Sequence, residues 1–347
     1  MFLHIDNISL TIMGQKTNKS INVFDILKKK KSVQLIFSYF LKYIDVIFIP
    51  FQIIFKQVSN FKIFRIIFFR LLPLDKEILV STTYGKYFIN TNDRIISKKI
   101  FINQEPYESK KVLEVLRLLK ENNLTISNLI EVGANIGSVT STFLLLDKKL
   151  TATAIEGNIY SKNYLDVNIY INNLTQRCKT VMSLIGNSTK DVFFVTFQGE
   201  SGNSMVFDTL NKSLIQRYSK KMNLNIKNIE KRKVSTLTEL DEIPVINRRT
   251  LIWLDIEGYE YSVLNGMQEL TTRPIIVFEI NPALISSTQK SPNLFIKNFE
   301  DLFINNSYSN AILLVKRSKN FEVRSGFLND ICEEISYSNA HGDILIY

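Results

Sequence analysis

The sequence predicts an α/β protein with a mostly parallel sheet, helices on both faces of that sheet, and an N-terminal apolar and basic helical segment. Three observations support this prediction. Strand-like and helix-like segments alternate from about residue 84 onwards, and such alternation implies right-handed crossovers between parallel strands. A turn containing Gly133 and Gly137 joins one of these strands to one of these helices. The first 74 residues carry 11 Lys and Arg against three Asp, so +8 of the chain's net charge of +10 lies there.

Residues 1–75 are predicted to form a separate segment that precedes the main domain, residues 76–347. Residues 1–31 are polar, and no apolar core of a signal peptide follows Met1. Residues 32–73 are dense in Ile and Phe, but their longest uncharged run is about half of the roughly 20 residues that span a bilayer. Two interpretations stay open. The segment is a helix lying on an anionic membrane surface, with basic side chains snorkelling, or it is a helical cap on the main domain.

The main domain is predicted element by element from its periodicity. A helix is expected over 109–123, because apolar residues recur there on one side at helical spacing. Two strand–helix pairs follow, at 126–132 with 137–149 and at 150–156 with 158–174. Further strands are predicted at 178–186, 191–198, 250–257, 273–280, 309–317 and 342–347.

The composition argues against several classes of function. Cys178 and Cys332 give no disulfide framework and no CxxC metal spacing. His4 and His341 are the two histidines, which argues against a histidine-rich metal site and against a Ser-His-Asp hydrolase. The 273 residues after Leu74 carry a net charge of only +2. The main domain is therefore not the basic part of the chain, and nucleic acid is disfavoured as its partner.

The stretch NLIEVGANIG, residues 128–137, is typical of a nucleotide-binding turn, because it ends a predicted strand and opens a predicted helix. Glycine lets the backbone approach a ligand, and free N–H groups at a helix start can face a carboxylate or a phosphate. The spacing differs from the G-x-G-x-x-G of dinucleotide sites. It fits the E/D-x-G-x-x-x-G turn of enzymes that use S-adenosylmethionine (AdoMet). The predicted cofactor-binding residues of this turn are Glu131, Gly133, Ala134, Asn135 and Gly137.

Glu156 ends the next predicted strand, 23 residues after Gly133. This is near the offset at which an acidic residue accepts hydrogen bonds from ribose hydroxyls in nucleotide-binding folds. We therefore predict that Glu156 and the neighbouring Asn158 bind the cofactor. A Glu at the end of a strand is also an ordinary surface residue, and that interpretation stays open.

Asp255, Glu257 and Glu260 cluster at the carboxyl end of the strand 250–257, where an open α/β sheet places its ligand crevice. Glu260 would also suit the first turn of a following helix, where an acid interacts favourably with the helix dipole. Asp255 has no basic residue nearby in the sequence to explain it as half of a local ion pair.

Four motifs in order resemble the FkbM family of AdoMet-dependent methyltransferases: NLIEVGANIG, AIEGN with LDVNIYINN, LDIEGYEYSVLNGM and PIIVFEI. The resemblance runs from about residue 84 to 347 and leaves residues 1–75 outside. Three departures stand out: Glu131 where Asp is more usual, Gly157 where Pro is frequent, and Trp253 where Lys is frequent. None of them removes a carboxylate.

The resemblance implies a Rossmann-like class I methyltransferase fold, AdoMet as cofactor, and methyl transfer to oxygen. The expected reaction is O-methylation of a sugar, glycan or lipid-linked acceptor, with Asp255 or Glu257 as the catalytic general base. A divalent metal held by Asp255, Glu257 and Glu279 is an option that we do not favour. The expected location is the cytoplasm, at the inner face of a membrane if the N-terminal segment binds lipid. An RNA methyltransferase and a non-catalytic AdoMet-fold scaffold at a membrane are the alternatives.

Overall fold

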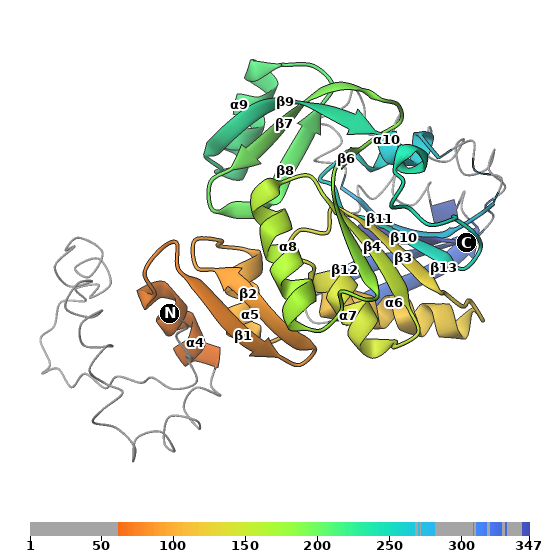
Figure 1. Cartoon of the computed structure of the whole chain (residues 1–347), viewed down its shortest axis with the longest axis horizontal. Helices are drawn as coiled ribbons and strands as arrows, with labels where there is room; N and C mark the ends of the chain where they lie inside the picture. The colour runs from red at the N-terminus through yellow and green to blue at the C-terminus, as the bar shows by residue number, and fades with distance from the viewer. Residues whose placement is uncertain are drawn as a thin grey trace, which may run out of the picture.

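The structure is a computed structural model, and it describes residues 62–267, 270, 272–281, 308, 310–317, 320–327, 330–331 and 342–347 (Figure 1). Residues 1–61 lie outside the described part, and with them most of the segment for which the sequence predicts a membrane-bound helix or a cap. His4, His341 and Cys332 also lie outside it. The division of the chain between residues 75 and 76 stays a prediction.

Eight of the described strands form the central sheet, in the order β13-β12-β14-β11-β10-β3-β4-β5. The strands from β11 to β5 in this order pair in parallel, whereas β14 runs antiparallel to both β11 and β12, and β13 runs antiparallel to β12. This confirms the predicted α/β fold with a mostly parallel sheet. Their bounds are β3 Asn128–Val132, β4 Thr151–Glu156, β5 Cys178–Met182, β10 Thr250–Leu254, β11 Ile275–Ile280, β12 Asn310–Arg317, β13 Asn320–Phe327 and β14 Gly342–Ile346.

Strand β3 lies in the middle of this sheet, between β4 and β10. The chain therefore runs from β3 to one side of the sheet and later returns to fill the other side. Such a reversal of strand order opens a crevice beyond the carboxyl ends of the strands, and open α/β sheets bind their ligands there.

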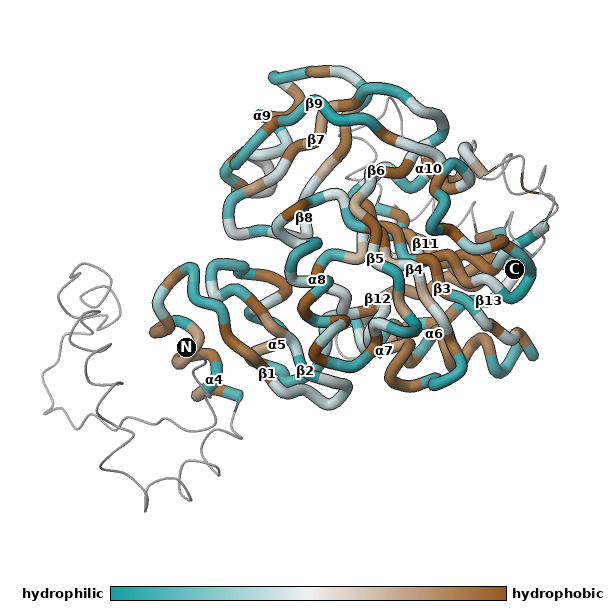
Figure 2. The backbone as a smooth tube through the Cα atoms, in the orientation of Figure 1, coloured by the Kyte–Doolittle hydropathy of each residue, from teal (hydrophilic) through white to brown (hydrophobic). Residues whose placement is uncertain are grey.

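Helices cover both faces of the central sheet, as predicted. On one face, apolar side chains of α6, α7 and α8 pack around Trp253 and its neighbours. On the other face, α10 and the short helix η1 pack against residues such as Ile252 and Leu254. Figure 2 shows the strands between these layers as strongly hydrophobic. The bounds are α6 Ser109–Glu121, α7 Ser138–Leu146, α8 Ile159–Ile171, η1 Leu237–Glu239 and α10 Glu260–Asn265.

A second sheet is inserted in sequence between β5 and β10, with the described strands in the order β6-β9-β7-β8. The predicted strand 178–186 is wrong as one element, since Ser183 separates β5 from β6 and the two join different sheets. Helix α9 packs on the insert through Ile215 and Tyr218. Because β5 leads directly into β6, the insert stands at the carboxyl ends of the central strands (Figure 1). Its elements are β6 Leu184–Ile185, β7 Lys190–Phe197, β8 Glu200–Phe207, α9 Lys212–Met222 and β9 Ile226–Ser235.

A small N-terminal unit is hydrogen-bonded to α8 and its C-terminal end through the side chains of two asparagines. The side chain of Asn168 accepts a hydrogen bond from the N–H of Phe88 (2.6 Å) and donates to its carbonyl (3.3 Å). Asn172 does the same for Lys86, at 2.9 and 2.7 Å. These amides satisfy the outer edge of β2, which would otherwise be left unpaired. The unit comprises α4 Lys62–Leu71, β1 Glu77–Thr82, β2 Gly85–Asn90 and α5 Ile96–Asn103.

Helix α4 belongs to the segment with two open interpretations. Phe68 and Phe69 contact Phe101 of α5, with ring centroids 6.2 and 5.4 Å apart. For α4 this packing favours a cap on the body of the protein, although Ile63 and Phe64 remain exposed. No helix in the described part of the chain has the length and apolar character needed to cross a bilayer.

Candidate functional site

The two positions in the turn after β3 that are occupied by glycine favour this residue for different structural reasons. Gly133 has a φ of +87°, and a Cβ built on it would lie 2.0 Å from the carbonyl oxygen of Asp255. Glycine thus lets the ends of β3 and β10 approach each other. Gly137 has a φ of +82° and is the N-cap of α7, where a Cβ would lie 2.6 Å from Leu165 of α8. The contact with the Asp255 carbonyl therefore requires glycine at position 133, and the positive φ favours glycine at position 137, where the end of the Leu165 side chain can shift. Both reasons hold independently of any ligand.

Glu131 lies inside the protein rather than in a cleft. Its carboxylate accepts hydrogen bonds from the backbone N–H of Thr140, at 2.9 Å, and from the Thr140 hydroxyl. These bonds fasten α7 to β3. Burial raises the pKa of Glu131 to about 8. Of the predicted cofactor residues, Glu131, Ala134, Gly137 and Asn158 do not line the cleft described next, and Gly133, Asn135 and Glu156 do.

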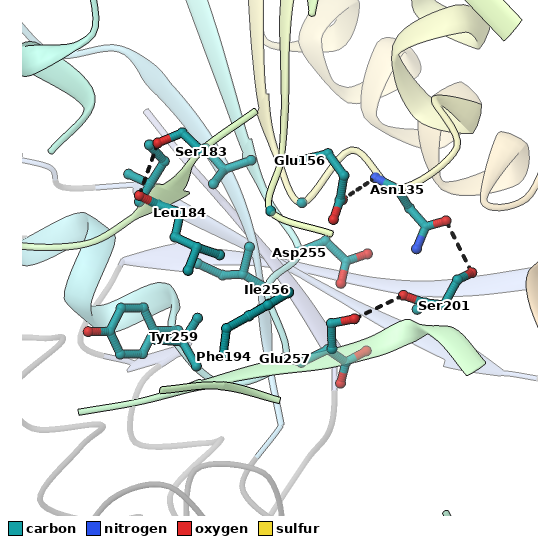
Figure 3. Close-up of a pocket in the computed structure, with 17 residues that line it drawn as sticks. Asn135, Glu156, Ser183, Leu184, Phe194, Ser201, Asp255, Ile256, Glu257 and Tyr259 are labelled. Atoms are coloured by element: carbon teal, nitrogen blue, oxygen red, sulfur yellow. Dashed lines mark hydrogen bonds between the residues drawn. The ribbon is translucent and has the colours of Figure 1, made fainter. Parts of the chain in front are cut away.

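The cleft lies between the carboxyl ends of β3, β4 and β10 and the inserted strand β8, with about 530 Å³ of empty space including its open mouth (Figure 3). Its polar lining is Asn135, Glu156, Ser183, Ser201, Ser204, Asp255 and Glu257. Its other side chains are Val132, Leu184, Ile185, Phe194, Val206, Ile256 and Tyr259, with Gly133, Gly157 and Gly202 completing the wall.

Glu156 is held by two loops at once. Its Oε2 accepts a hydrogen bond from the backbone N–H of Asn135 at 2.7 Å, and its Oε1 accepts one from the N–H of Asn158 at 2.6 Å. Burial raises the pKa of Glu156, and the backbone bonds from Asn158 and Asn135 oppose that rise. A carboxylate has about four lone-pair sites. Glu156 therefore keeps capacity to accept hydroxyl groups from a molecule in the cleft.

The three acids after β10 separate into two roles. Asp255 and Glu257 line the cleft, and Glu257 has a φ of +55°. Glu260 is buried, and its Oε1 accepts hydrogen bonds from the N–H groups of Ile256 (3.0 Å) and Gly258 (3.3 Å). Glu260 thus fixes the loop that presents the other two acids, a supporting role related to the capping alternative.

Burial raises the pKa of both cleft acids well above the usual range. For Asp255, Glu108 adds to the rise and Lys111 opposes it. For Glu257, the carboxylates of Glu279 and Glu260 add to the rise. Both carboxyl groups can therefore hold a proton more readily than an exposed acid.

The structure supplies Asp255 with a cation that the local sequence does not show. Lys111 of α6 is buried, and its Nζ lies 2.9 Å from both Glu108 Oε2 and Asp343 Oδ1, and 5.5 Å from the ring centre of Trp253. Asp343 pairs in register with Glu279, and Asp255 follows the next strand of the sheet. Lys111 therefore lies near a row of three acids, which are Asp343 on β14, Glu279 on β11 and Asp255 directly after β10.

The charges within this row shift one another. Burial alone would lower the pKa of Lys111, but Asp343, Glu108 and Asp255 outweigh burial and raise it. Burial raises the pKa of Asp343 to about 6 against the opposing effect of Lys111. Within the described residues, no three His, Cys, Asp or Glu side chains gather closely enough to hold a metal ion.

Comparison of the chain with known proteins identifies its family. The family model described as the methyltransferase FkbM domain matches residues 131–307, about half of the chain. A search of curated proteins found no match. The family match and the strand order identify the Rossmann-like class I methyltransferase fold that the sequence predicts.

Solved structures resemble the chain at low identity. TYW2 of M. jannaschii, in complex with AdoMet, is 10% identical, with 79% of this chain and 87% of that chain covered and a TM-score of 0.41. An O-methyltransferase of Bacillus cereus, in complex with SAH, is 14% identical, with 70% and 80% covered and a TM-score of 0.34. Precorrin-6y C5,15-methyltransferase of Geobacter metallireducens is 14% identical, with 67% and 87% covered and a TM-score of 0.32.

Proposed function

Because the chain belongs to the FkbM methyltransferase family, we propose that it transfers the methyl group of AdoMet to a hydroxyl oxygen of a sugar or glycan. One observation carries this proposal. Glu156, suited to a ribose, and the acids Asp255 and Glu257, suited to a hydroxyl, line the same cleft at the switch point of the sheet.

The cleft offers a matching environment to each part of AdoMet. The free lone pairs of Glu156 suit the two ribose hydroxyls. The apolar side chains of Leu184 and Phe194 suit the adenine ring, and Phe194 can stack against it. The turn at Gly133 and Asn135 is left for the methionine moiety, with the start of α7 following it.

Methyl transfer to an alcohol forms a C–O bond, breaks a C–S bond and releases one proton from the hydroxyl. Asp255 or Glu257 would accept that proton, because the raised pKa of each carboxyl group makes its carboxylate a stronger proton acceptor than that of an exposed acid. Holding the hydroxyl in line with the methyl group would supply much of the remaining rate. The walls from the insert, which include Ser201 and Val206, would exclude water from the reacting atoms.

Incubation with isotopically labelled AdoMet and a panel of glycans, lipid-linked sugars and RNA tests the function. We expect label in a glycan or a lipid-linked sugar. We expect the variant Asp255→Asn to keep AdoMet binding and to lose about 10²-fold or more in turnover, the scale of general-base catalysis. The matched control is Asp241→Asn, since Asp241 is an exposed acid away from the cleft.

The outcomes separate the alternatives. Label in RNA alone would favour the RNA methyltransferase. Binding of AdoMet without transfer to any of the acceptors would favour the scaffold. Unchanged turnover in a folded Asp255→Asn variant would remove that residue from the catalytic role while leaving the family assignment intact.

A further inference from the structure

The inserted strand β8 reaches the cleft through Ser201 and Ser204, which the sequence analysis did not single out. Both side chains line the cleft, and β8 is the outermost described strand of the insert, bonded in its sheet to β7. A strand at the edge of this sheet could have a structural role within the insert and no other role. The contacts of its two serines point instead toward the loops of the central sheet.

Ser201 lies between the loop that precedes α5 and the turn after β3. Its hydroxyl is 2.7 Å from Asp93 Oδ2 and 3.3 Å from Asn135 Oδ1, and Figure 3 shows the second contact. The hydroxyl has one proton, so it donates to one of these oxygens at a time. A half-turn of the Asn135 amide would let the side-chain NH₂ of Asn135 donate to Ser201 instead. With the amide turned in this way, Ser201 can donate to Asp93 and accept from Asn135 at the same time, and β8 is then joined to both.

Ser204 makes the corresponding contact with the loop after β4. The Asn158 side-chain amide donates to the Ser204 hydroxyl at 3.3 Å. The other side-chain atom of Asn158, its Oδ1, accepts from the N–H of Tyr160 at 3.0 Å and caps α8. The side chain of Asn158 is therefore fixed from two directions.

The two asparagines have a second property in common. The backbone N–H of Asn135 donates to Glu156 Oε2, and that of Asn158 donates to Glu156 Oε1. Each asparagine therefore bonds Glu156 with its main chain and β8 with its side chain. Asn135 does so with a φ of +49°, a conformation that an L residue adopts at some cost and that surrounding contacts must maintain.

We infer that Ser201 and Ser204 are positioning residues for the cofactor. Through Asn135 and Asn158 they hold the two N–H donors that orient the Glu156 carboxylate, so that the ribose seat and the inserted strand form one unit. The inference rests on the proposed seat of AdoMet at Glu156. By thermodynamic linkage, if the position of β8 strengthens cofactor binding, then bound cofactor stabilises that position of β8 by the same free energy.

Calorimetric titration of the full chain with AdoMet and S-adenosylhomocysteine tests the inference. The double variant Ser201→Ala with Ser204→Ala should bind both ligands about tenfold more weakly, which corresponds to about 1.4 kcal/mol. The variant Ser201→Thr with Ser204→Thr keeps both hydroxyls and should bind within about threefold of the parent. Ser188→Ala changes an exposed serine of the same insert and serves as the matched control.

Hydrogen exchange supplies a readout that a purely structural role would not move. AdoMet should protect the amides of residues 200–204 in the parent, and this protection should be lost in the double alanine variant. Parent-like affinity in a folded double variant would overturn the inference, and so would exchange of 200–204 that ignores AdoMet in the parent. Glu156→Ala separates the two levels. If it abolishes binding while the double variant binds like the parent, only the serine inference fails. If it binds like the parent, the cofactor seat itself is wrong, and the inference falls with it.

Discussion

Replacing Lys111 tests how much its buried ion pairs with Glu108 and Asp343 stabilise the protein. Lys111→Met keeps an unbranched side chain of similar length against Trp253 and removes the charge. Glu108 and Asp343, each 2.9 Å from the Lys111 Nζ in the parent, then lose their cation. Breaking a buried ion pair by removing one partner costs about 3–5 kcal/mol, because the remaining charge is left uncompensated. Loss on that scale is a large part of the roughly 5–15 kcal/mol that stabilises a typical protein.

The cost should depend on pH in a defined direction. Burial already raises the folded-state pKa of Asp343 to about 6, above the roughly 3.9 of an unfolded chain. The folded state therefore binds more protons than the unfolded state between these values, so stability falls as the pH rises through that window. Without Lys111 the folded-state pKa of Asp343 rises further, and the window extends to higher pH. The variant should thus lose less stability at pH 5 than at pH 8.

Urea unfolding at pH 5 and at pH 8 measures both effects. The matched control is Lys110→Met, because Lys110 is exposed on the same helix and lies 3.8 Å from Glu105. Exposed pairs contribute about 0–1 kcal/mol, so this control should stay close to the parent at either pH. The reasoning would be refuted by a Lys111→Met variant as stable as the parent at pH 8, or by a loss of equal size at both pH values.

Two further predictions come from the fold and one comes from the sequence. Gly133→Ala should prevent stable folding, seen as loss of a cooperative thermal transition, because its Cβ would lie 2.0 Å from the Asp255 carbonyl oxygen; a parent-like melting temperature would contradict this. Asn168→Ala should leave the N–H of Phe88 without its acceptor, the Asn168 Oδ1 at 2.6 Å, and lower the free energy of unfolding by about 1–3 kcal/mol. Amide exchange should then be faster in β2 than in β10. Equal protection of the two strands would count against a role of Asn168 in holding β2. The full chain should float with anionic liposomes, in part released by salt, through residues 28–73; absence of flotation would leave the cap interpretation.

The elements predicted best are those with a clear local pattern, such as a helix with one buried apolar face or a strand that is buried along almost its whole length. The helix predicted over 109–123 is α6, and the strand predicted over 150–156 is β4 with one residue more at its start. The inserted sheet was harder to predict. Strand β9 reads IKNIEKRKVS, with charged residues at half of its positions, and β6 has two residues that pair with a strand about 50 positions away. Local propensity cannot find pairings that only tertiary structure creates.

The same distinction applies to the site. Gly133, Asn135, Glu156, Asp255 and Glu257 lie in one cleft, as the rule for the carboxyl ends of parallel strands predicts. The residues that sequence reasoning missed come from elsewhere in the chain. Lys111 arrives on α6, and the serines arrive on β8. The Ser, Gly and Asn content of residues 199–204 is typical of a loop, whereas the structure forms strand β8 from Glu200 onwards, and local composition does not show which cleft that strand lines.

The turn after β3 packs against the chain after β10 and also lines the cleft. These two roles decide how cofactor binding should be probed. A side chain at position 133 collides with the Asp255 carbonyl before it could meet a ligand, so loss of binding in such a variant would report on folding. A change at Glu156 is cleaner, but it also frees the N–H groups of Asn135 and Asn158. A ligand that lacks one ribose hydroxyl disturbs neither loop. Its loss of affinity in the parent, compared with its loss in Glu156→Ala, isolates the contact between hydroxyl and carboxylate, because the cost of the altered loops cancels in the difference.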